Sequence, residues 1–329
     1  MAKHKPLVSM EDAVAIQRLA RSLEYISVQE AASKWVLSDR RVRYLCEQGK
    51  IQGAVKEGKS YKIPAGAIKP LDGRESRWFN IPECYREQFS HIDSMKRELD
   101  RRRPLTPGEL ARLRDDFTIN YTYNTNAIEG STLTLSETRL VLEGVTIDQK
   151  PLNDHLAAVG HRDAFQYMVS LVSENAPLTE RTVKELHSLV LMDRPMDRGV
   201  YRRIPVMISG ATHKPPQPYL VEPKMEQLVL WFNKNEGRLH PLQRLAQFHL
   251  DFEGVHPFID GNGRTGRLLL NFGLMKFGYL PIDIKFTDRR KYYAAFEAYY
   301  GQNDVTPMVQ LIADYEQEAL QERLDILAV

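Results

Sequence analysis

Cysteine is scarce in this sequence. Cys46 and Cys84 are the only two among 329 residues, which is too few for a disulfide framework or a zinc cluster. So low a cysteine content fits a protein that works in a reducing compartment. The composition therefore argues against the small disulfide-rich and the cysteine-rich zinc-binding classes of protein.

Long apolar runs are also absent. No stretch is long enough to span a bilayer. The opening residues, MAKHKPLVSMEDAV, lack the apolar core of a secretory signal. We therefore expect a cytoplasmic protein without a membrane partner.

A strong net charge is missing as well. The formal charge is only +2 at pH 7, and 43% hydrophobic and 27% charged residues are ordinary values for a globular protein. Charge alone therefore does not predict binding to nucleic acid. The charge is uneven, however, because residues 1–75 hold 14 Lys and Arg against 9 Asp and Glu. A solvated surface explains this basic N-terminal excess equally well.

The N-terminal region has the pattern of a small domain over residues 1–75. An amphipathic helix is expected over 9–24 and a short helix over 28–35, and another helix starts near Ser38. Residues 53–64 alternate apolar and polar positions around Glu-Gly-Lys, which predicts a β-hairpin.

This order of helix, turn, helix and hairpin resembles the excisionase-like winged helix-turn-helix group. The resemblance implies that cations on the second helix and on the hairpin contact DNA phosphates. The candidate DNA-binding residues are Arg40, Arg41, Arg43, Tyr44 and Lys59. A docking or dimerisation module with a basic solvent-exposed face is the alternative.

The remainder of the chain is expected to be mainly α. Residues 76–105 are interpreted as a linker with one helix near 83–101, and residues 106–329 as the main domain. Capping boxes at Thr106 and Thr134 mark two helix starts. Later helices are expected near 152–174, 178–191 and 222–236, and from 240 to the end.

Residues 199–221, GVYRRIPVMISGATHKPPQPYL, interrupt this helical pattern. Residues of high β propensity flank Ser209-Gly210, and Pro215, Pro216 and Pro218 follow. The segment predicts a β-hairpin on the helical body.

The string HPFIDGNGRTGR at residues 256–267 concentrates chemistry in one loop. Gly261 and Gly263 precede an apolar helical run, and a flexible loop that enters a helix N-terminus is a good anion site. Arg264 and Arg267 share one face of that helix. His256 can accept a proton near neutral pH. These residue types together favour phosphoryl or nucleotidyl transfer.

Asp260 lies in the same loop and offers a hard oxygen ligand. Mg²⁺ in proteins is commonly held by one carboxylate together with phosphate oxygens and water. The sequence therefore predicts a magnesium site at Asp260.

The string resembles the signature of the Fic family at every specified position: His-Pro-Phe, two variable residues, Gly-Asn-Gly-Arg, two more, and Arg. The resemblance extends over about residues 105–315, and it implies a Fic helical bundle with a β-hairpin flap. It also implies transfer of AMP from ATP to a Ser, Thr or Tyr hydroxyl of a target protein or of the protein itself. His256 would be the catalytic base. Gly261, Asn262, Gly263, Arg264 and Arg267 would bind ATP, and Asp260 would hold Mg²⁺.

Two further elements follow from the same resemblance. The stretch TNAIEG at residues 125–130 is similar to the inhibitory motif of self-inhibited Fic proteins, so Thr125, Glu129 and Gly130 would form a brake in which Glu129 pairs with Arg267. The hairpin would be the flap that pairs with the target segment. The flap residues are Ile208, Ser209, Gly210, Ala211, Thr212 and His213.

Several alternatives stay open at this point. The protein could be mainly a DNA-binding regulator that uses the Fic domain as a nucleotide switch. Some family members transfer UMP, phosphocholine or phosphate, and others remove AMP from a modified protein. Some also use a homodimer to control the brake.

Overall fold

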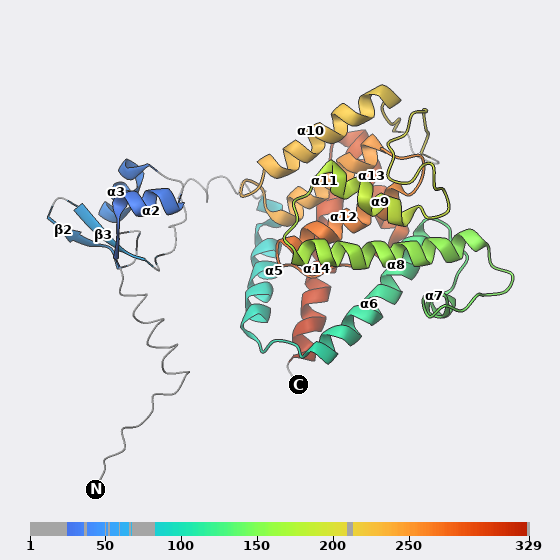
Figure 1. The fold of residues 1–329 in the computed structure, drawn as a ribbon, viewed down its shortest axis with the longest axis horizontal. Coiled ribbons are helices and arrows are strands. Elements are labelled where there is room, and N and C mark those ends of the chain that lie inside the picture. The colour runs from blue at the N-terminus through green and yellow to red at the C-terminus, as the bar shows by residue number, and fades with distance from the viewer. Residues whose placement is uncertain are drawn as a thin grey trace, which may run out of the picture. The chain divides into compact units, whose positions relative to one another are not determined.

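The computed structural model describes residues 25–35, 38–49, 51, 53–58, 60–65, 67, 83–208 and 213–327. The helix expected over 9–24, Lys59 and the flap residues Ser209–Thr212 lie outside these described residues. The chain divides into two compact units, Met1–Arg77 and Trp78–Val329, and each is considered by itself (Figure 1).

The described part of the first unit has the elements β1 (Tyr25–Ser27), α2 (Val28–Trp35), α3 (Asp39–Glu47), β2 (Val55–Glu57) and β3 (Ser60–Pro64). The three strands form an antiparallel sheet in the order β1-β3-β2. The two helices and the hairpin confirm the sequence prediction. Strand β1 was not predicted, because three residues are too few for a readable alternation.

Local signals explain where the helices of this unit start. Ser27 and Glu30 form a reciprocal capping box, with Ser27 N donating to Glu30 Oε2 at 2.7 Å. Ser38 Oγ accepts from Arg41 N at the start of α3. Helix α3 packs against α2, α2 packs against β3, and the apolar side chains of both helices share one cluster with the fully buried Ile63 of β3.

The second unit is a helical body. Its helices are α5 (Glu83–Arg101), α6 (Pro107–Ile128), α7 (Leu135–Leu142), α8 (Leu152–Ser173), α9 (Glu180–Val190), α10 (Val221–Lys234), α11 (Pro241–Val255), α12 (Asn262–Lys276), α13 (Arg289–Gln302) and α14 (Thr306–Ile326). Two short 3₁₀ helices, Pro218–Leu220 and Phe286–Asp288, complete it. None of the helices described is long and apolar enough to cross a membrane.

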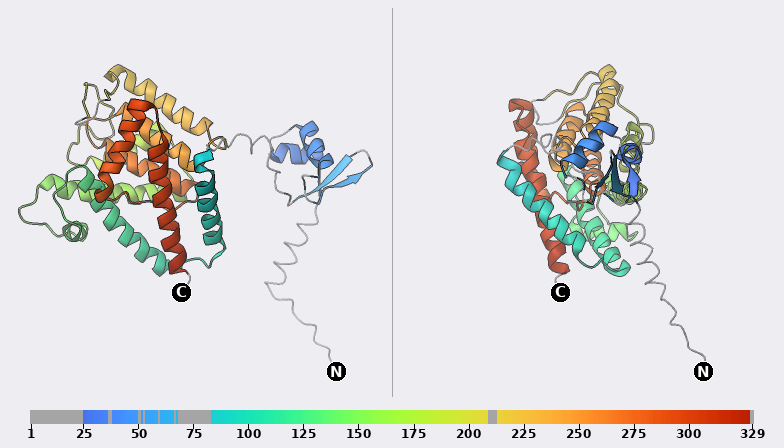
Figure 2. Two further views of the ribbon diagram at one scale, coloured as in Figure 1. Left: turned by 180° about the vertical axis from the view of Figure 1, so that it is seen from behind. Right: turned by 90° about the vertical axis from the view of Figure 1, so that its left-hand side faces the viewer.

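Helix α12 lies at the centre of this body. It packs against α6, α8, α9 and α11, and most of its side chains are buried. Helices α5 and α14 run side by side on another face, as the view from behind in Figure 2 shows. Tyr85, Phe89 and Ile92 of α5 join the same hydrophobic core. A loop that leads into α12 is therefore attached to the buried centre of this helical body.

The capping boxes predicted at Thr106 and Thr134 are present at the starts of α6 and α7. The hairpin predicted over 199–221 is not confirmed, because the described residues of that segment contain no strand. Its two arms are joined instead by Arg202, which donates to Ile204 O and to Pro216 O. Proline supplies no N–H for a strand ladder, and prolines occupy positions 205, 215, 216 and 218.

Candidate active site

The candidate site is built around the loop between α11 and α12. His256 ends α11 in the left-handed conformation, with φ 47°, and Gly261 precedes α12 with φ 74°. Two positive φ values within six residues fold the loop back on itself, and at Gly261 glycine adopts this geometry without strain. The first backbone N–H groups of α12 have no side-chain cap and no acceptor within their helix. They are therefore free to bind an anion.

Asn262 holds this loop closed. Its Oδ1 accepts from Phe258 N at 2.9 Å, and its Nδ2 donates to Phe258 O at 3.0 Å. The Asn262 side chain is buried, and these two bonds hold it in place within the loop. Its backbone N–H lies in the first turn of α12, where an anion would bind.

His187 of α9 supports the loop from below and was not found by sequence reasoning. Its ring stacks on Phe258 with centroids 3.6 Å apart. Nδ1 accepts from Gly199 N at 2.8 Å, so the neutral ring donates from Nε2 to Asp260 O at 2.9 Å. Burial lowers the pKa of His187 to about 4, which keeps the ring neutral.

His256 is neutral at physiological pH in this environment. Burial lowers its pKa to about 4. Its main-chain oxygen accepts from Arg202 Nε at 2.8 Å, and Glu253 Oε2 lies 3.8 Å from its Nδ1. Burial also raises the pKa of Glu253 to about 8, so this neighbour is mostly uncharged near pH 7. A neutral imidazole can accept a proton, which a base requires.

Arg267 is buried and surrounded by acceptors. Its Nε donates to Thr125 Oγ1 at 2.7 Å, and Nη2 donates to Thr125 O at 3.0 Å and to Glu129 Oε1 at 2.7 Å. Nη1 lies 3.4 Å from the hydroxyl of Tyr292. The structure therefore places Thr125 and Glu129 from the end of α6 directly on the second arginine of the loop.

Two glycines allow this ion pair to form. Gly130 follows Glu129 with φ 96°, which lets the chain turn away from α6. A side chain at Gly263 would overlap the Glu129 carboxylate. Glu129 thus occupies the space beside the first turn of α12, where an anion would also bind.

Asp260 is half-exposed at the edge of the loop. Its Oδ1 accepts from Gly261 N at 2.6 Å and lies 3.6 Å from Arg264 Nη2, while Oδ2 lies 3.3 Å from Arg194 Nη2. Groups of three or more metal-binding side chains are not found among the described residues. A single accessible carboxylate suits Mg²⁺ that is bound mainly through phosphate oxygens, and it does not suit a protein-only metal cage.

A cavity of about 440 Å³ opens beside the loop. Glu129, His256, Gly263 and Arg267 form its polar side. The other side of the cavity is aromatic and consists of Tyr292, Tyr293, Phe296 and Tyr300. The sequence did not predict these four residues because only the fold brings them to the loop. The lining does not include Asp260 or Arg264.

The flap residues that the structure describes also reach this cavity. Ile208 and His213 line it, and Met207 is 91% exposed beside them. The His213 ring stacks on Tyr300 at 4.1 Å, and its Nε2 lies 2.9 Å from Gly254 O. The start and the end of the flap are therefore adjacent to the loop, although no strand forms there.

The candidate DNA-binding residues on α3 are on its outer face. Arg40, Arg43 and Tyr44 are exposed, and Arg41 is half-buried with its guanidinium 5.3 Å from the Tyr44 ring. This unit therefore presents several cations on one short helix.

Comparison with known proteins assigns the second unit. Residues 177–274, which include α9 and the loop, match the model of the Fic/DOC family. Residues 177–274 therefore form a Fic domain. Protein adenylyltransferase Fic of Drosophila yakuba is 36% identical over 217 residues, which are 65% of this chain and 43% of that protein. The chain thus spans less than half the length of the curated relatives it matches.

Solved structures agree with this assignment. A Fic domain-containing signalling protein from Bacteroides thetaiotaomicron superimposes with a TM-score of 0.67 and 28% identity, over 73% of this chain and 97% of that one. Fic-1 from C. elegans superimposes with a TM-score of 0.65 and 28% identity, over 74% and 72%. The mainly helical architecture predicted from the sequence is confirmed.

Proposed function

We propose that this protein is an auto-inhibited protein adenylyltransferase, which transfers AMP from ATP to a hydroxyl of a target protein or of itself. One observation carries the proposal: Glu129 pairs with Arg267 at 2.7 Å inside the cavity that also holds the neutral His256. The names of the Drosophila relatives, at 35–36% identity, support the same activity.

The proposed reaction is a single displacement at the α-phosphorus. The imidazole of His256 takes the proton from the target hydroxyl, the hydroxyl oxygen bonds to the α-phosphorus, and pyrophosphate leaves as the α–β phosphoanhydride bond breaks. Backbone N–H groups at Gly263 and its neighbours bind the phosphates at the start of α12. The aromatic wall at Tyr293 and Phe296 gives the adenine ring a surface for stacking.

Asp260 is the residue that would hold Mg²⁺, together with phosphate oxygens. The ion would neutralise charge on the polyphosphate as pyrophosphate leaves. Arg194 and Arg264 lie close to Asp260, so they would face the same phosphates.

The brake works by competition for Arg267. In the closed state the guanidinium is neutralised by Glu129, so it is not available to the γ-phosphate. The Glu129 carboxylate would also repel the triphosphate. ATP that binds under these conditions has its α-phosphate misplaced, and misplacement by about 1 Å can cost on the order of 10²-fold in rate.

Mass spectrometry of the intact protein after incubation with Mg·ATP tests the activity. We expect an added AMP on Glu129→Gly and little on the wild type. Glu143→Gly is a matched control, because Glu143 ends α7 and precedes Gly144 as Glu129 ends α6 and precedes Gly130. Lysate proteins treated in the same way would reveal external targets. Absence of any adduct on Glu129→Gly and on lysate proteins would refute the proposal.

The same site could run in reverse and remove AMP from a modified protein. Glu129 would then position the attacking water rather than act as a brake. Loss of AMP from a previously modified protein on addition of wild type, but not of Glu129→Gly, would favour this alternative. Other transferred groups, such as UMP, phosphocholine or phosphate, are distinguished by the mass of the adduct.

DNA binding by the first unit is a second proposal. The exposed Arg40 and Arg43 on α3, beside a three-stranded sheet, support a winged helix-turn-helix that contacts phosphates. A gel-shift assay on the promoter of its own gene, with and without ATP, tests it. Each lost phosphate contact should lower the slope of log K against log salt by about 1, so Arg40→Gln should reduce it. Unchanged DNA binding by the double variant Arg40→Gln plus Arg43→Gln would show that this face of α3 does not contact DNA.

We further propose that the protein acts in the cytoplasm, which is supported by two cysteines that are both free thiols. A homodimer that modulates the brake is also proposed. Light scattering across a concentration range tests the dimer.

A further inference from the structure

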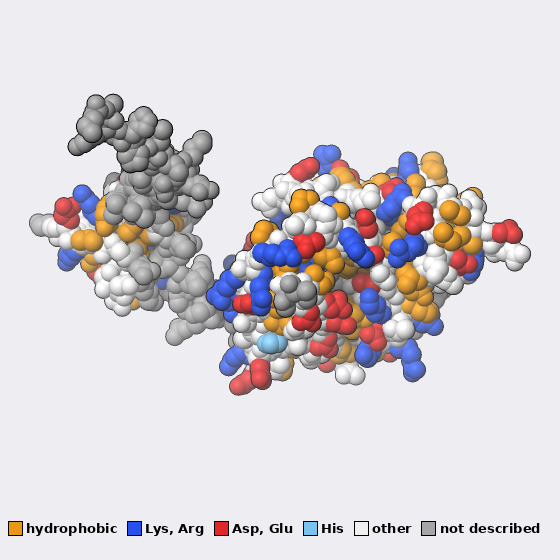
Figure 3. Space-filling model, turned by 90° about the horizontal axis from the view of Figure 1, so that it is seen from below, with side chains coloured by type: hydrophobic (Ala, Val, Ile, Leu, Met, Phe, Trp, Pro, Cys, Tyr) orange, Lys and Arg blue, Asp and Glu red, His pale blue; other side chains and the backbone are white. Residues whose placement is uncertain are grey.

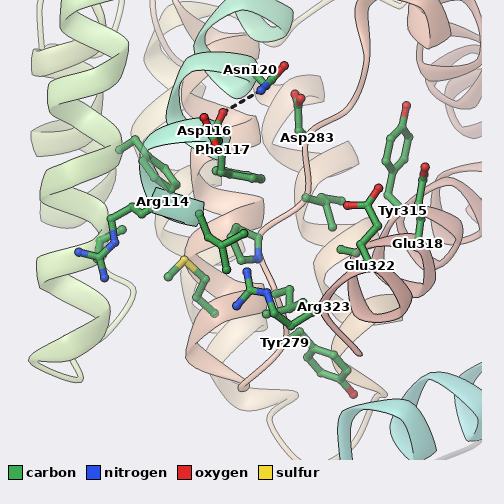
Figure 4. Close-up of a pocket in the computed structure, with 18 of the residues that line it drawn as sticks. Arg114, Asp116, Phe117, Asn120, Tyr279, Asp283, Tyr315, Glu318, Glu322 and Arg323 are labelled. Carbon is green, nitrogen blue, oxygen red and sulfur yellow. Dashed lines mark hydrogen bonds between the residues drawn. The ribbon is translucent and has the colours of Figure 1, made fainter. Parts of the chain in front are cut away.

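A second cavity, of about 470 Å³, lies in the helical body and shares no lining residue with the first. Its volume is in the range of small-molecule sites, about 300–1,000 Å³. Helices α6, α8 and α14 and the loop after α12 enclose it (Figure 4). Nothing in the proposed transfer reaction uses it.

The walls of this cavity are largely apolar. Leu113 and Phe117 of α6, Phe165 of α8, Met275 of α12 and Ile282 of the following loop line it. These side chains would hold the hydrocarbon part of a ligand. The lining includes Leu110, near the start of α6, and Ile326, at the end of α14. Figure 3 views the molecule from below, and hydrophobic side chains lie among charged ones on this face of the helical body.

One cation enters this apolar space. Arg323 is half-buried and extends from α14 toward the middle of the cavity (Figure 4). Throughout the described ranges, no acceptor forms a hydrogen bond or ion pair with its guanidinium. Partial burial of the side chain lowers the pKa of Arg323. A guanidinium in such surroundings gains from an anionic partner.

The rim restricts which anion can enter. The exposed lining residues carry both signs of charge: Asp116, Glu318 and Glu322 are acidic, and Arg114 and Lys285 are basic. Lys285 pairs with the lining carboxylate of Asp283 at 2.8 Å, so the three exposed acidic residues outnumber the remaining exposed cation, and Figure 4 shows the two glutamates beside the cavity. Their charges are partly screened, but they disfavour a polyanion such as a nucleotide or a phosphorylated lipid. A ligand with a single negative charge and an apolar tail fits both the wall and the rim.

The cavity is connected to the brake through α6. Asp283 of the lining accepts from Asn124 Nδ2 at 2.7 Å, and Asn124 Oδ1 accepts from Phe286 N at 3.0 Å. The next residue is Thr125, which accepts from Arg267 Nε at 2.7 Å. One turn of α6 therefore contacts the wall of the second cavity and the arginine of the first.

A second connection runs through α13. The Tyr315 hydroxyl lines the cavity, accepts from Lys285 N at 3.0 Å and donates to Asp288 Oδ2 at 2.8 Å. Asp288 directly precedes α13, which carries Tyr292 to Arg267. A displacement of Asp283 or of Tyr315 in the cavity wall would thus be transmitted to the Glu129–Arg267 pair.

We propose that this cavity binds a small amphipathic monocarboxylate, with its carboxylate on Arg323 and its tail against Leu113 and Phe117, and that the bound ligand favours the closed brake. The proposed effect of the ligand on the brake rests on the proposed function. We expect the ligand to favour the closed brake because the structure contains both the formed cavity and the closed Glu129–Arg267 pair. A ligand that selects this conformation lowers the affinity for ATP, and ATP lowers the affinity for the ligand by the same factor.

Calorimetric titration of decanoate into the full chain tests the site. Decanoate should bind the wild type, and Arg323→Gln should bind it about 10- to 100-fold more weakly, the value of a hydrogen bond to a charged group. Arg112→Gln is the matched control, because Arg112 is an exposed arginine of α6 outside the lining. Decanol and decylamine should bind more weakly than decanoate.

Ala319→Leu gives an independent variant, since a larger side chain at this lining position fills the cavity while Arg323 stays. Melting curves confirm that each variant is folded. Absence of decanoate binding to the wild type would overturn the site. Equal binding by Arg323→Gln, by Ala319→Leu, or of decylamine would overturn it too.

ATP affinity with and without decanoate tests the connection to the brake. Decanoate should weaken ATP binding to the wild type severalfold and leave Glu129→Gly unchanged. Equal ATP affinity in the presence of bound decanoate would overturn the connection. Neither readout depends on AMP transfer, so failure of the transferase proposal would leave the binding result interpretable.

Discussion

The loop at 256–267 and the flap segment that faces it are held in opposite ways. The loop is closed by its own residues, with Asn262 bonded twice to the Phe258 backbone, and Phe258 is fully buried against His187. The flap segment reaches the same cavity with Met207 91% exposed. Its arms are joined through one side chain, that of Arg202.

This difference matches the two tasks that the proposed reaction sets. Phosphate chemistry requires fixed donors and a fixed base, because small displacements cost large factors in rate. Recognition of a protein segment tolerates an adaptable surface, and exposed apolar side chains provide one. Arg202 links the two regions, since the same guanidinium also donates to His256 O.

The largest expected effect comes from removal of the base in the rigid region. His256→Ala should lower AMP transfer by about 10²–10⁴-fold, the usual contribution of a general base, while ATP still binds. Label transfer from α-labelled ATP, in a Glu129→Gly background, measures it. His91→Ala on α5 is the control, because His91 is exposed and lies outside the cavity lining. Wild-type turnover in His256→Ala would refute the role of the base.

Removal of the link between the two regions should have the next largest effect. Arg202→Gln leaves the partly buried carbonyl oxygens of His256 and Pro216 without this donor, and an unsatisfied group that is fully buried costs about 1–3 kcal/mol. The free energy of unfolding should fall by about 2 kcal/mol. Urea denaturation measures it, with the exposed Arg203→Gln as control. Equal stability of the two variants would show that Arg202 is not the link.

The pH dependence of AMP transfer tests whether His256 is buried in the loop. The base form of His256 is the neutral one, and its pKa in the folded protein is lowered from 6.5 to about 4. Transfer by Glu129→Gly should therefore be constant from pH 7, where Glu253 is mostly uncharged, to about pH 6, and fall only toward about pH 4. Since protonation of His256 favours the unfolded chain, its contribution to stability declines as pH falls from about 6.5 toward 4, whereas Glu253, with its pKa raised to about 8, contributes in the opposite direction. A rate that halves near pH 6.5, with circular dichroism unchanged, would contradict burial of the base.

The smallest effect is expected on the adaptable side. Met207→Ser should change the free energy of unfolding by less than about 0.5 kcal/mol, as exposed substitutions do. ATP binding should be unaffected, whereas labelling of lysate proteins should decrease severalfold. Met196→Ser is matched, since Met196 is 87% exposed elsewhere on the surface. A loss of ATP affinity in Met207→Ser would place this residue on the nucleotide side instead.

The parts of the structure that were predictable depend on neighbours in sequence. Thr106 and Thr134 mark helix starts because each forms a capping box with the residue three positions later in the sequence. The loop residues were predictable because they all lie in one short segment, 256–267. The flap hairpin was predicted from β propensity, but strands need a partner, and the described segment is organised by Arg202 instead. His187 and Tyr292 escaped detection because only tertiary packing brings them to the loop.

The central claim is that Arg267 is shared between Glu129 and the γ-phosphate of ATP. Single-turnover transfer from α-labelled ATP tests it in wild type, Glu129→Gly, and Glu129→Gly combined with Arg267→Gln. We expect a gain on the order of 10²-fold in Glu129→Gly, and loss of that gain when Arg267 is also replaced. Equal rates in wild type and Glu129→Gly, or a gain that survives Arg267→Gln, would contradict it.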